Sequence, residues 1–509
     1  MYADLRDYLS HLEAVGKLRH VAKEVDKDWE LGCIARWVFQ AVPDSERYAL
    51  MFDRIKGYDT PLVVGVAAGS RPIYAEGLGV RPERIYDTWV RALSQPIPPC
   101  EVKDGPVKEV IRSGNDVDLN ELPIAVWTPG KDAGPYLTAN CVITRDPDDG
   151  AYNIGNYRMM LRDSTSTAIQ IFPSQHVGLH FDKYKARRQN MPMCVAIGVD
   201  PSISYCAVAK IPLTLDEYQV AGGLRGAPIE TVKAEICDIQ VPAAAEWVLE
   251  GEVPWDVMAP EGPFGEYVGY MGLESMKNVF NVRCITHRTK PIYQAFLSQK
   301  PPSESHVIQS EAIAALMFKH LKYDLGIPGI LDVNFTEGSA RLHLIVQMKP
   351  AYPGHSRKTM LIAANLLDAN TPKMVTVVDD DIDIRDPEMV EWARASRCDP
   401  ASDVVILKDV QTTILDPSTI EIDDQDRVNV NESRVLGSKL LIDATIKRAY
   451  SEVSLPPYKM MMDVFERWPQ TGLPEIEAPP RLLKLLEKHP TDNLVIRPYS
   501  SPSAEGEAR

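Results

Sequence analysis

The chain has 509 residues, 45 % of them hydrophobic, which is enough to bury large cores and to form about two to four domains. Its 55 lysines and arginines against 71 aspartates and glutamates give a net charge of −16, spread along the chain. That balance argues against a general nucleic-acid binder, which needs a basic patch. It leaves room for an anionic small substrate held by a local arginine or metal.

Three further features of the sequence bear on where in the cell the protein is found. No run of about 18 apolar residues occurs, so we expect no transmembrane helix. The N-terminal residues 1–7 are charged and lack the apolar region of a secretory signal. The eight cysteines are scattered and form no C-x-x-C pair. Together these features predict a reduced, cytoplasmic protein whose cysteines are mostly small core residues.

Residues 1–105 predict a small α/β domain. Apolar residues at helical spacing predict a first helix that ends at Gly16, and a second helix spans about residues 30–42. Residues 48–66 predict strands that end in a turn of small residues. Prolines 96, 98 and 99 and the polar segment 103–106 predict a domain boundary.

The next segment, residues 106–305, predicts a split β-barrel domain, because short β-rich runs alternate with turn residues. These runs are 137–144, 193–199, 205–211, 229–241, 279–287 and 292–297.

Two segments complete the predicted α/β (α+β) protein. Residues 306–450 alternate helices and strands and predict a C-terminal α/β domain. Residues 451–509 predict a proline-rich linker, an amphipathic helix over about 480–487 and a disordered tail. The apolar face of residues 482–486 predicts burial against another subunit.

The clearest candidate for acid–base chemistry is the stretch from Glu261 to Glu266, where two carboxylates flank a turn. Gly262 and Gly265 permit unusual backbone angles and Pro263 fixes its own, so the turn is bent and stiff. Paired carboxylates around such a bend can raise one another's pKa and keep a proton available near neutral pH. A surface turn with two solvated glutamates is the alternative.

Two other segments carry polar groups that fit an anion or a metal. Asn153, Gly155 and Arg158 offer an amide oxygen, close backbone approach and a fixed cation. His176 lies four residues before His180, but the H-E-x-x-H pattern of zinc proteases is absent. Structural roles for either histidine, and a solvated arginine on an edge strand, are the alternatives.

A carboxylate, Glu217, opens a predicted helix that closes near Gly222–Gly226. With an asparagine and a histidine it forms an oxygen and nitrogen set suited to Mn²⁺ or Mg²⁺, although a plain helix cap explains it equally. The aspartates of residues 379–383 follow a predicted strand and are compatible with a metal or phosphate loop, or with a solvated strand exit. Neither a P-loop nor a G-x-G-x-x-G motif is present.

Taken together, the order and spacing of these segments resemble the UbiD family of (de)carboxylases that use prenylated FMN. The resemblance covers nearly the whole chain and rests on residues 4–9, 153–158, 175–176, 216–226, 261–266, 378–384, 392–398, 415–417 and 437–445. A cofactor-contacting lysine of the ferulate-type branch has no counterpart, its place falling near Leu367. This departure argues against the cinnamate branch and not against the family.

The resemblance implies a role for each of several residues. Asn153, His176 and Glu217 would hold Mn²⁺ against the flavin phosphate, and Arg158, Glu261 and Glu266 would form the catalytic network. A potassium site would use the carbonyls of Cys206, Ala207 and Ala209 together with Arg397. The cofactor would be lined by Ile154, Gly155, Asn156, Tyr157, Arg158, Phe172, Pro173, Ser174 and Gln175.

The function that follows is reversible, non-oxidative decarboxylation of an aromatic, heteroaromatic or α,β-unsaturated acid, with Glu266 as proton donor. A cofactor must carry this chemistry because no side chain offers an electron sink. His306, Thr413 and Leu415 are candidates for the substrate pocket. The expected partners are a flavin prenyltransferase that supplies the cofactor and further copies of the chain, in a homodimer or homohexamer.

Two other functions stay open at this point. One is a flavin-free, Mn²⁺-dependent hydrolase that uses Glu261 and Glu266 as an acid and base pair. The other is a non-catalytic paralogue that acts as a binding or assembly subunit. The joint presence of the six polar residues named above for metal binding and catalysis argues against the second.

Overall fold

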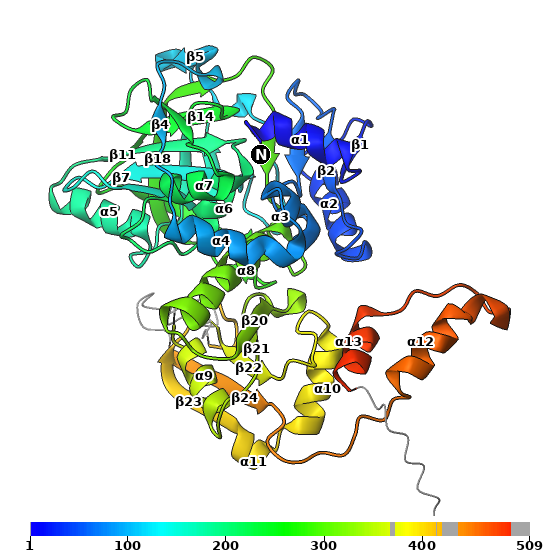
Figure 1. Ribbon diagram of the computed structural model, residues 1–509. Helices are drawn as coiled ribbons and strands as arrows, with labels where there is room; N and C mark the ends of the chain where they lie inside the picture. Colours follow the sequence, from blue (N-terminus) through cyan, green and yellow to red (C-terminus); the bar gives the residue numbers. More distant parts are fainter. Residues whose placement is uncertain (1, 367–371, 414, 420–435, 490–509) are drawn as a thin grey trace, which may run out of the picture.

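The computed structural model describes residues 2–366, 372–413, 415–419 and 436–489, and confirms the mixed α/β class (Figure 1). Two lobes meet at helix α8 (Glu304–Lys319). The position of Leu367 and the predicted tail 500–509 lie outside the described residues. No helix among the described residues is long and apolar enough to cross a membrane.

The N-terminal part of the upper lobe is a small α/β unit. Its first helix begins at Leu5 because Asp4 caps it, accepting a hydrogen bond from the backbone N–H of Asp7. The strands follow the order β1-β2-β3-β19. The elements are α1 (Leu5–Ala14), β1 (Leu18–Val21), α2 (Glu30–Ala41), β2 (Ala49–Phe52), β3 (Leu62–Val64), α3 (Arg71–Gly77), α4 (Ile85–Ser94) and β19 (Tyr293–Ala295).

The centre of the upper lobe is a large, mostly antiparallel sheet in the order β6-β9-β10-β18-β14-β11-β7-β8, with β5 and β15 also paired to β18. Its strands are β5 (Val110–Ser113), β6 (Tyr136–Leu137), β7 (Asn140–Arg145), β8 (Tyr152–Asn156), β9 (Met159–Asp163), β10 (Ser166–Ile169), β11 (Met191–Ile197), β14 (Trp247–Val253), β15 (Met258–Glu261) and β18 (Ser275–His287). This half-barrel confirms the predicted central β-rich architecture.

Helices and small sheets cover both faces of the large sheet. Residues of α4, α6 and α7 share one core with strand residues such as Ile143 and Ile154, whereas Val177 and Phe181 of α5 pack into the opposite core. These elements are α5 (His176–Ala186), α6 (Pro201–Val208) and α7 (Glu217–Arg225). The small sheets are β13-β12-β4 and β16-β17, from β4 (Cys100–Glu101), β12 (Glu230–Lys233), β13 (Gln240–Pro242), β16 (Phe264–Gly265) and β17 (Met271–Gly272).

One predicted strand is wrong. Residues 205–211 were expected to be extended, but the helix α6 runs through most of them. Almost every side chain of α6 is buried, so the helix has no polar face and its hydrophobic residues show no 3.6-residue spacing. The signals that identify the helix are Asp200, whose side chain caps the N-terminus, and Pro201 in the first turn.

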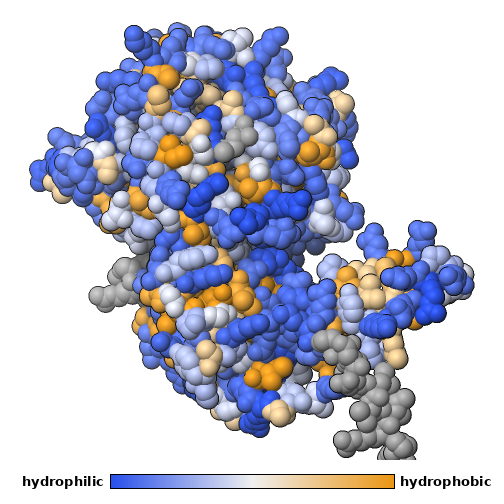
Figure 2. All heavy atoms as spheres, in the orientation of Figure 1, coloured by the Kyte–Doolittle hydropathy of each residue, from blue (hydrophilic) through white to orange (hydrophobic). Residues whose placement is uncertain are grey.

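The lower lobe is a second α/β unit, with strands in the order β20-β21-β22-β24-β23. Its elements are α8, β20 (Ile330–Phe335), β21 (His343–Met348), α9 (His355–Ala363), β22 (Met374–Val378), α10 (Pro387–Arg397), α11 (Pro400–Asp403), β23 (Val404–Gln411) and β24 (Leu436–Ala444). Apolar side chains gather near α8 and β20, below the waist between the lobes, on an otherwise mostly hydrophilic face (Figure 2). The predicted division of the sequence at residues 105, 305 and 450 stays a prediction.

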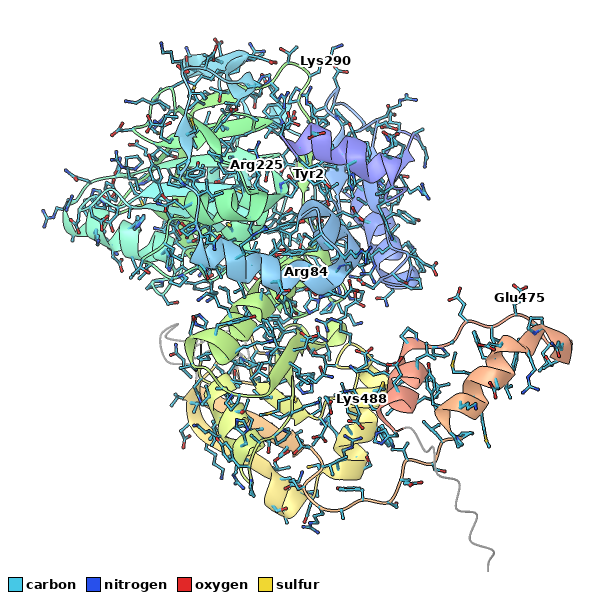
Figure 3. All side chains as sticks on the ribbon, viewed as in Figure 1. Tyr2, Arg84, Arg225, Lys290, Glu475 and Lys488 are labelled. Carbon is cyan, nitrogen blue, oxygen red and sulfur yellow. The ribbon has the colours of Figure 1, made fainter. Side chains whose placement is uncertain are left out.

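The C-terminal arm leaves the lower lobe and returns to it. Helix α12 (Tyr458–Glu466) lies out in the arm, and α13 (Pro480–Lys488) packs back beside α10. Figure 3 shows Glu475 at the far end of the arm and Lys488 back at the lobe, where its Nζ lies 2.6 Å from Asp380. Leu486 is buried and Leu485 packs against the lobe's core. Leu486 is thus buried by its own chain, whereas Leu482, Leu483 and Leu485 are half-buried, and the prediction that this face contacts another subunit stays a prediction.

The junction between the lobes depends on Glu304, the first residue of α8. Its carboxylate is fully buried and accepts hydrogen bonds from the backbone N–H groups of Gly65 (2.6 Å), Ala67 (3.0 Å) and Ala68 (3.3 Å). Burial raises the pKa of Glu304 from 4.5 to about 7, although these hydrogen bonds act in the opposite direction.

This shift predicts how stability depends on pH. The carboxyl of Glu304 holds its proton more tightly in the folded protein than in the unfolded chain. Its contribution to the free energy of unfolding is therefore full below pH 4.5 and is lost as the pH rises through about 7. The difference corresponds to about 3 kcal/mol. Thermal unfolding from pH 5 to pH 8 should therefore show the melting temperature of the wild type falling relative to that of Glu304→Gln. A difference that stays constant or grows with pH would contradict this assignment.

Candidate functional site

The centre of the site is Arg158, which lies between two carboxylates. Its Nη2 donates to Oε2 of Glu261 at 2.7 Å, and its Nη1 pairs with Oε1 of Glu266. The side chains of Arg158, Glu261 and Glu266 expose only 10 %, 0 % and 10 % of their surface. The structure therefore brings together the three residues predicted to form the catalytic network.

The turn between the two glutamates places them on the same cation. Glu261 ends β15, and β16 and β17 form a tight hairpin around Glu266, whose backbone N–H donates to the carbonyl of Tyr270. Gly262 has a φ of +93°, and a Cβ there would lie 2.8 Å from the carbonyl oxygen of Leu273. Only glycine satisfies both conditions without strain.

Aromatic rings form the floor of this cluster. The guanidinium of Arg158 lies 5.5 Å from the ring centroid of Phe264, and that ring packs on Tyr136 at 4.2 Å. The hydroxyl of Tyr136 accepts from the N–H of Gly262 at 3.1 Å. The rings keep water away from one side of the ion pairs, which strengthens them.

The two glutamates are not equivalent. Glu261 is fully enclosed, and its Oε1 has no hydrogen-bond partner. Glu266 keeps some exposure, so it is the carboxylate that a ligand can reach. The Nε of Arg158 also lacks a partner.

A second polar group forms at the edge of the large sheet. Asn153 lies on β8, which is the last strand in the sheet order. Helix α5 begins with His176 on one face of the sheet, and α7 begins with Glu217 on the other. Nδ1 of His176 lies 3.7 Å from Oε1 of Glu217, so both helix starts converge beside this edge strand.

This group has the properties of a metal site. Glu217 is 3 % exposed, yet its Oε2 has no hydrogen-bond partner. Burial raises the pKa of its carboxyl, although the nearby imidazole of His176 acts to lower it. A cation would satisfy the orphaned oxygen, and an amide, an imidazole and a carboxylate fit Mn²⁺ or Mg²⁺. The residues present therefore fit the metal that the sequence predicts.

The two histidines four residues apart do not share a metal. Nδ1 of His180 pairs with Oγ1 of Thr144 at 3.0 Å, and its Nε2 lies 3.7 Å from Asp146. Burial lowers the pKa of His180. This histidine therefore has a structural role, which was the alternative to metal binding.

The predicted cofactor-lining residues fall into two groups. Ile154 packs into the core under α6 and α7, so it can offer a cofactor only its backbone, whereas Asn156 donates its amide N–H groups to the carbonyls of Thr138 and Asn140 and keeps its side-chain oxygen. The others differ in exposure. Pro173 and Ser174 are exposed, Phe172 and Gln175 are half-buried, and Gly155 and Tyr157 are buried on β8 and just after it.

The predicted potassium site is only partly assembled. Cys206, Ala207 and Ala209 lie at the C-terminal end of α6, where the last helix carbonyls lack i+4 donors, although that of Cys206 accepts from the N–H of Ala209 at 3.2 Å. Arg397 lies on α10 in the other lobe (Figure 1), where it is paired with Asp379 and Asp381. The structure does not bring Arg397 to α6, so its inclusion in that set is corrected here. A guanidinium is also a donor and not a cation ligand.

The three candidate pocket residues lie in two places. His306 is buried in the first turns of α8, and burial with nearby Arg341 lowers the pKa of its ring to about 3, so it is neutral. Thr413 and Leu415 are half-buried after β23 and hydrogen-bond to one another.

Sequence reasoning missed Arg341. This buried residue of the lower lobe donates to the hydroxyl of Tyr267 at 2.9 Å, and its guanidinium lies 4.9 Å from the ring centroid. Tyr267 directly follows Glu266, so the lower lobe contacts the turn that carries the proposed acid. No local pattern identifies this contact, because it joins residues 74 positions apart.

Comparisons with known proteins identify the family to which the chain belongs. Residues 9–93, 100–301 and 306–444 match the N-terminal, Rift-related and C-terminal domains of 3-octaprenyl-4-hydroxybenzoate carboxy-lyase, UbiD. The protein sll0936 of Synechocystis is 30 % identical over 94 % of this chain and 97 % of its own.

Two solved structures of one enzyme have the same fold. The UbiD-class enzyme HmfF of Pelotomaculum thermopropionicum, in complex with FMN, is 34 % identical, covers 89 % of this chain and 97 % of its own, and has a TM-score of 0.78. An evolved dimeric form of HmfF holds prenylated FMN, at 33 % identity over the same shares of the two chains and a TM-score of 0.77.

The vanillic acid decarboxylase of Sedimentibacter hydroxybenzoicus is 27 % identical over 93 % of this chain and 100 % of its own, with a TM-score of 0.78. The three matched carboxy-lyase domains, the UbiD-class neighbour and the decarboxylase neighbour identify the protein as a carboxy-lyase, and the chain belongs to the UbiD family.

Proposed function

We propose that this carboxy-lyase reversibly decarboxylates an aromatic, heteroaromatic or α,β-unsaturated acid with prenylated FMN, and that Glu266 supplies the proton. The observation that carries the proposal is Arg158 held between Glu261 and Glu266 beside a metal-ligand set. A buried carboxylate that is fixed by a cation, and still reachable, suits delivery of one proton to one carbon.

The cofactor would be held from the sheet edge. Asn153, His176 and Glu217 would bind Mn²⁺, and the metal would bind the flavin phosphate in a chain whose net charge is −16. The C-terminal end of α6, with the carbonyls of Ala207 and Ala209, supports a K⁺ site there. When bound, prenylated FMN supplies the electron sink for the charge that departing CO₂ leaves behind.

The chain's own residues do the rest. Arg158 orients the substrate carboxylate and holds Oε1 of Glu266, leaving the other carboxyl oxygen to carry the proton. Glu261, with one oxygen on Arg158 and the other unpartnered, fixes the position of the guanidinium. The aromatic floor excludes water, so the proton on the product carbon comes from Glu266.

For the substrate we favour a planar ring acid. Vanillic acid, named for the Sedimentibacter enzyme, belongs to this class, and the chemistry needs an sp² carbon next to the carboxylate. A panel of ring, enoic and saturated acids, followed by headspace CO₂ and product mass, would test this preference. Turnover of saturated acids alone would contradict it.

The other hypotheses are weaker. The relatives and structures named above give the Mn²⁺-dependent hydrolase no support. A non-catalytic paralogue has no need to keep Arg158, Glu261 and Glu266 in contact.

The role of Glu266 can be tested directly. Glu266→Gln keeps the size of the side chain but cannot supply an acidic proton, so we expect a loss of turnover of about 10²–10⁴-fold. Cofactor and substrate binding should remain nearly intact. The measurement is CO₂ release in D₂O together with deuterium at the former carboxyl carbon.

Exposed Glu274, eight residues away, offers the matched control Glu274→Gln, which should behave as the wild type. Near-normal turnover and deuterium incorporation in Glu266→Gln would reject the assignment and make Glu261 the better candidate for the acid.

The close packing around Arg158 gives a second prediction. A Cβ at Gly272 would lie 3.0 Å from Nη1 of Arg158 and 3.2 Å from Oε1 of Glu266. Gly272→Ala should displace this ion pair and lower kcat by about 10-fold or more. Gly134→Ala is the control, because a Cβ there meets nothing within 4 Å. Equal activity of the two variants would show that the pair tolerates displacement.

The metal set predicts the composition of the loaded protein. Native mass spectrometry and metal analysis should find one flavin-derived species and one Mn²⁺ per chain, and the same spectra would distinguish a homodimer from a homohexamer. Glu217→Gln removes the buried charge that the cation neutralises, so it should reduce both metal content and flavin absorbance. Wild-type protein that is fully active with neither species would end the proposal.

A further inference from the structure

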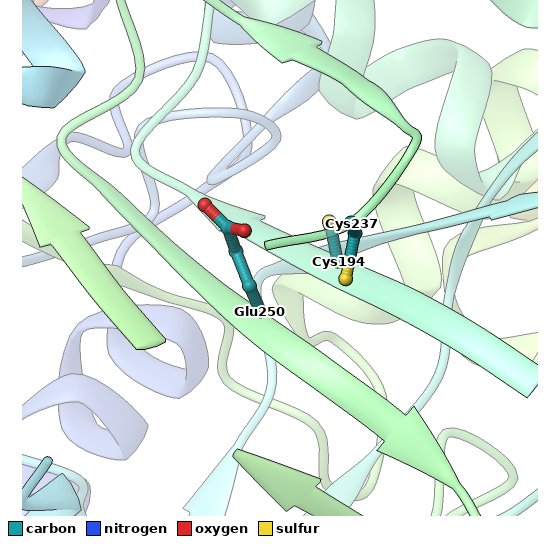
Figure 4. A group of neighbouring side chains, drawn as sticks. All are labelled: Cys194, Cys237 and Glu250. Carbon is teal, nitrogen blue, oxygen red and sulfur yellow. The ribbon is translucent and has the colours of Figure 1, made fainter. Parts of the chain in front are cut away.

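A second group of candidate metal ligands lies away from the site described above. Cys194 of β11 pairs directly with Glu250 of β14, so both side chains stand on the same face of the large sheet. Cys237, in the loop between β12 and β13, covers them. One ligand atom from each of these three residues lies within 4.8 Å of the others, and all three residues are buried (Figure 4).

The loop is held in place by the same residues. The two carboxylate oxygens of Glu250 accept from the backbone N–H groups of Glu235 (2.9 Å) and Ile236 (2.8 Å). The thiol of Cys237 lies 3.5 Å from the carbonyl of Gly251, which follows Glu250. The cluster is therefore positioned by backbone contacts before any ligand enters.

We propose that Cys194, Cys237 and Glu250 bind a zinc ion that clips the β12–β13 loop onto the large sheet. Zinc accepts thiolate and carboxylate ligands in a tetrahedron, with sulfur at about 2.3 Å and oxygen at about 2.0–2.2 Å. Such a tetrahedron brings its ligand atoms to roughly 3.5–3.8 Å of one another, which the present cluster reaches with small movements. Two thiol protons leave to solvent as the metal binds, and water fills the fourth position.

The donor set selects the metal. Two thiolates favour a soft or borderline cation such as Zn²⁺, whereas the set at Asn153 has no sulfur and favours Mn²⁺ or Mg²⁺. The two sites should therefore take different metals in one chain. The path of a metal ion from solvent to the site is short, because Ile236, next to Cys237, is 52 % exposed.

The site would join two sheets. Strands β12 and β13 belong to the small sheet with β4, and Cys194 and Glu250 belong to the large one. A metal ion bound to residues of both sheets would connect the small sheet, whose strand β4 begins at Cys100, to the core of the upper lobe. We therefore expect zinc to stabilise the lobe without taking part in the reaction.

The test uses full-length, cofactor-loaded protein. After treatment with a thiol reductant, which is then removed, and dialysis against Zn²⁺, metal analysis should find one zinc per chain beside any cofactor metal. Co²⁺ in place of zinc should give thiolate charge-transfer absorption. Cys194→Ser and Cys237→Ser should each weaken binding by more than the about 10-fold that loss of a residue supporting a metal ligand costs. Cys141→Ser is the matched control, a buried thiol on the same face of the sheet and outside the cluster.

If a serine variant fails to fold, the proposal can still be tested by a measurement on the wild type. Zinc should protect Cys194 and Cys237 from alkylation in partly unfolded protein, and should leave the exposed Cys33 and Cys100 fully reactive. No stoichiometric zinc, serine variants that bind as the wild type does, or recovery of Cys194 and Cys237 joined as a disulfide under these conditions would each overturn the proposal.

Discussion

A guanidinium enclosed by two carboxylates is the interaction on which the site depends. Removing three charges from water is costly, and their mutual attraction offsets the cost only when the geometry is held closely. Here the glycines of the Glu261–Glu266 turn let the backbone bend tightly, and the ring of Phe264 supports the cation. Loss of Arg158 would leave two buried carboxylates without their shared cation, so both glutamates depend on this one residue.

The proposed cofactor site depends on where the large sheet ends. Because β8 is an edge strand, helices from opposite faces can both reach it, and their first residues present His176 and Glu217 beside Asn153. Arg158 follows the same strand two residues after its end. One short segment thus contributes to both the metal group and the ion pairs, which explains why the two lie together.

Local signals in the sequence were enough for part of this picture. The spacing of Leu5, Leu9 and Leu12 predicted α1, and the start of α7 at Glu217 was placed correctly. Periodicity failed for α6, which is buried on all sides and so has no polar face to reveal its period.

Contacts between distant segments were beyond such signals. The pairing of Arg397 with Asp379 and Asp381, and that of Arg341 with Tyr267, depend on how whole elements pack. The second pairing has an evolutionary consequence. Because the lower lobe holds the residue next to Glu266, exchanging that lobe with a relative's would also change the surroundings of the acid. The two lobes are therefore expected to accept substitutions in a correlated way, and chimeras would inherit mismatches at the contact between Arg341 and Tyr267.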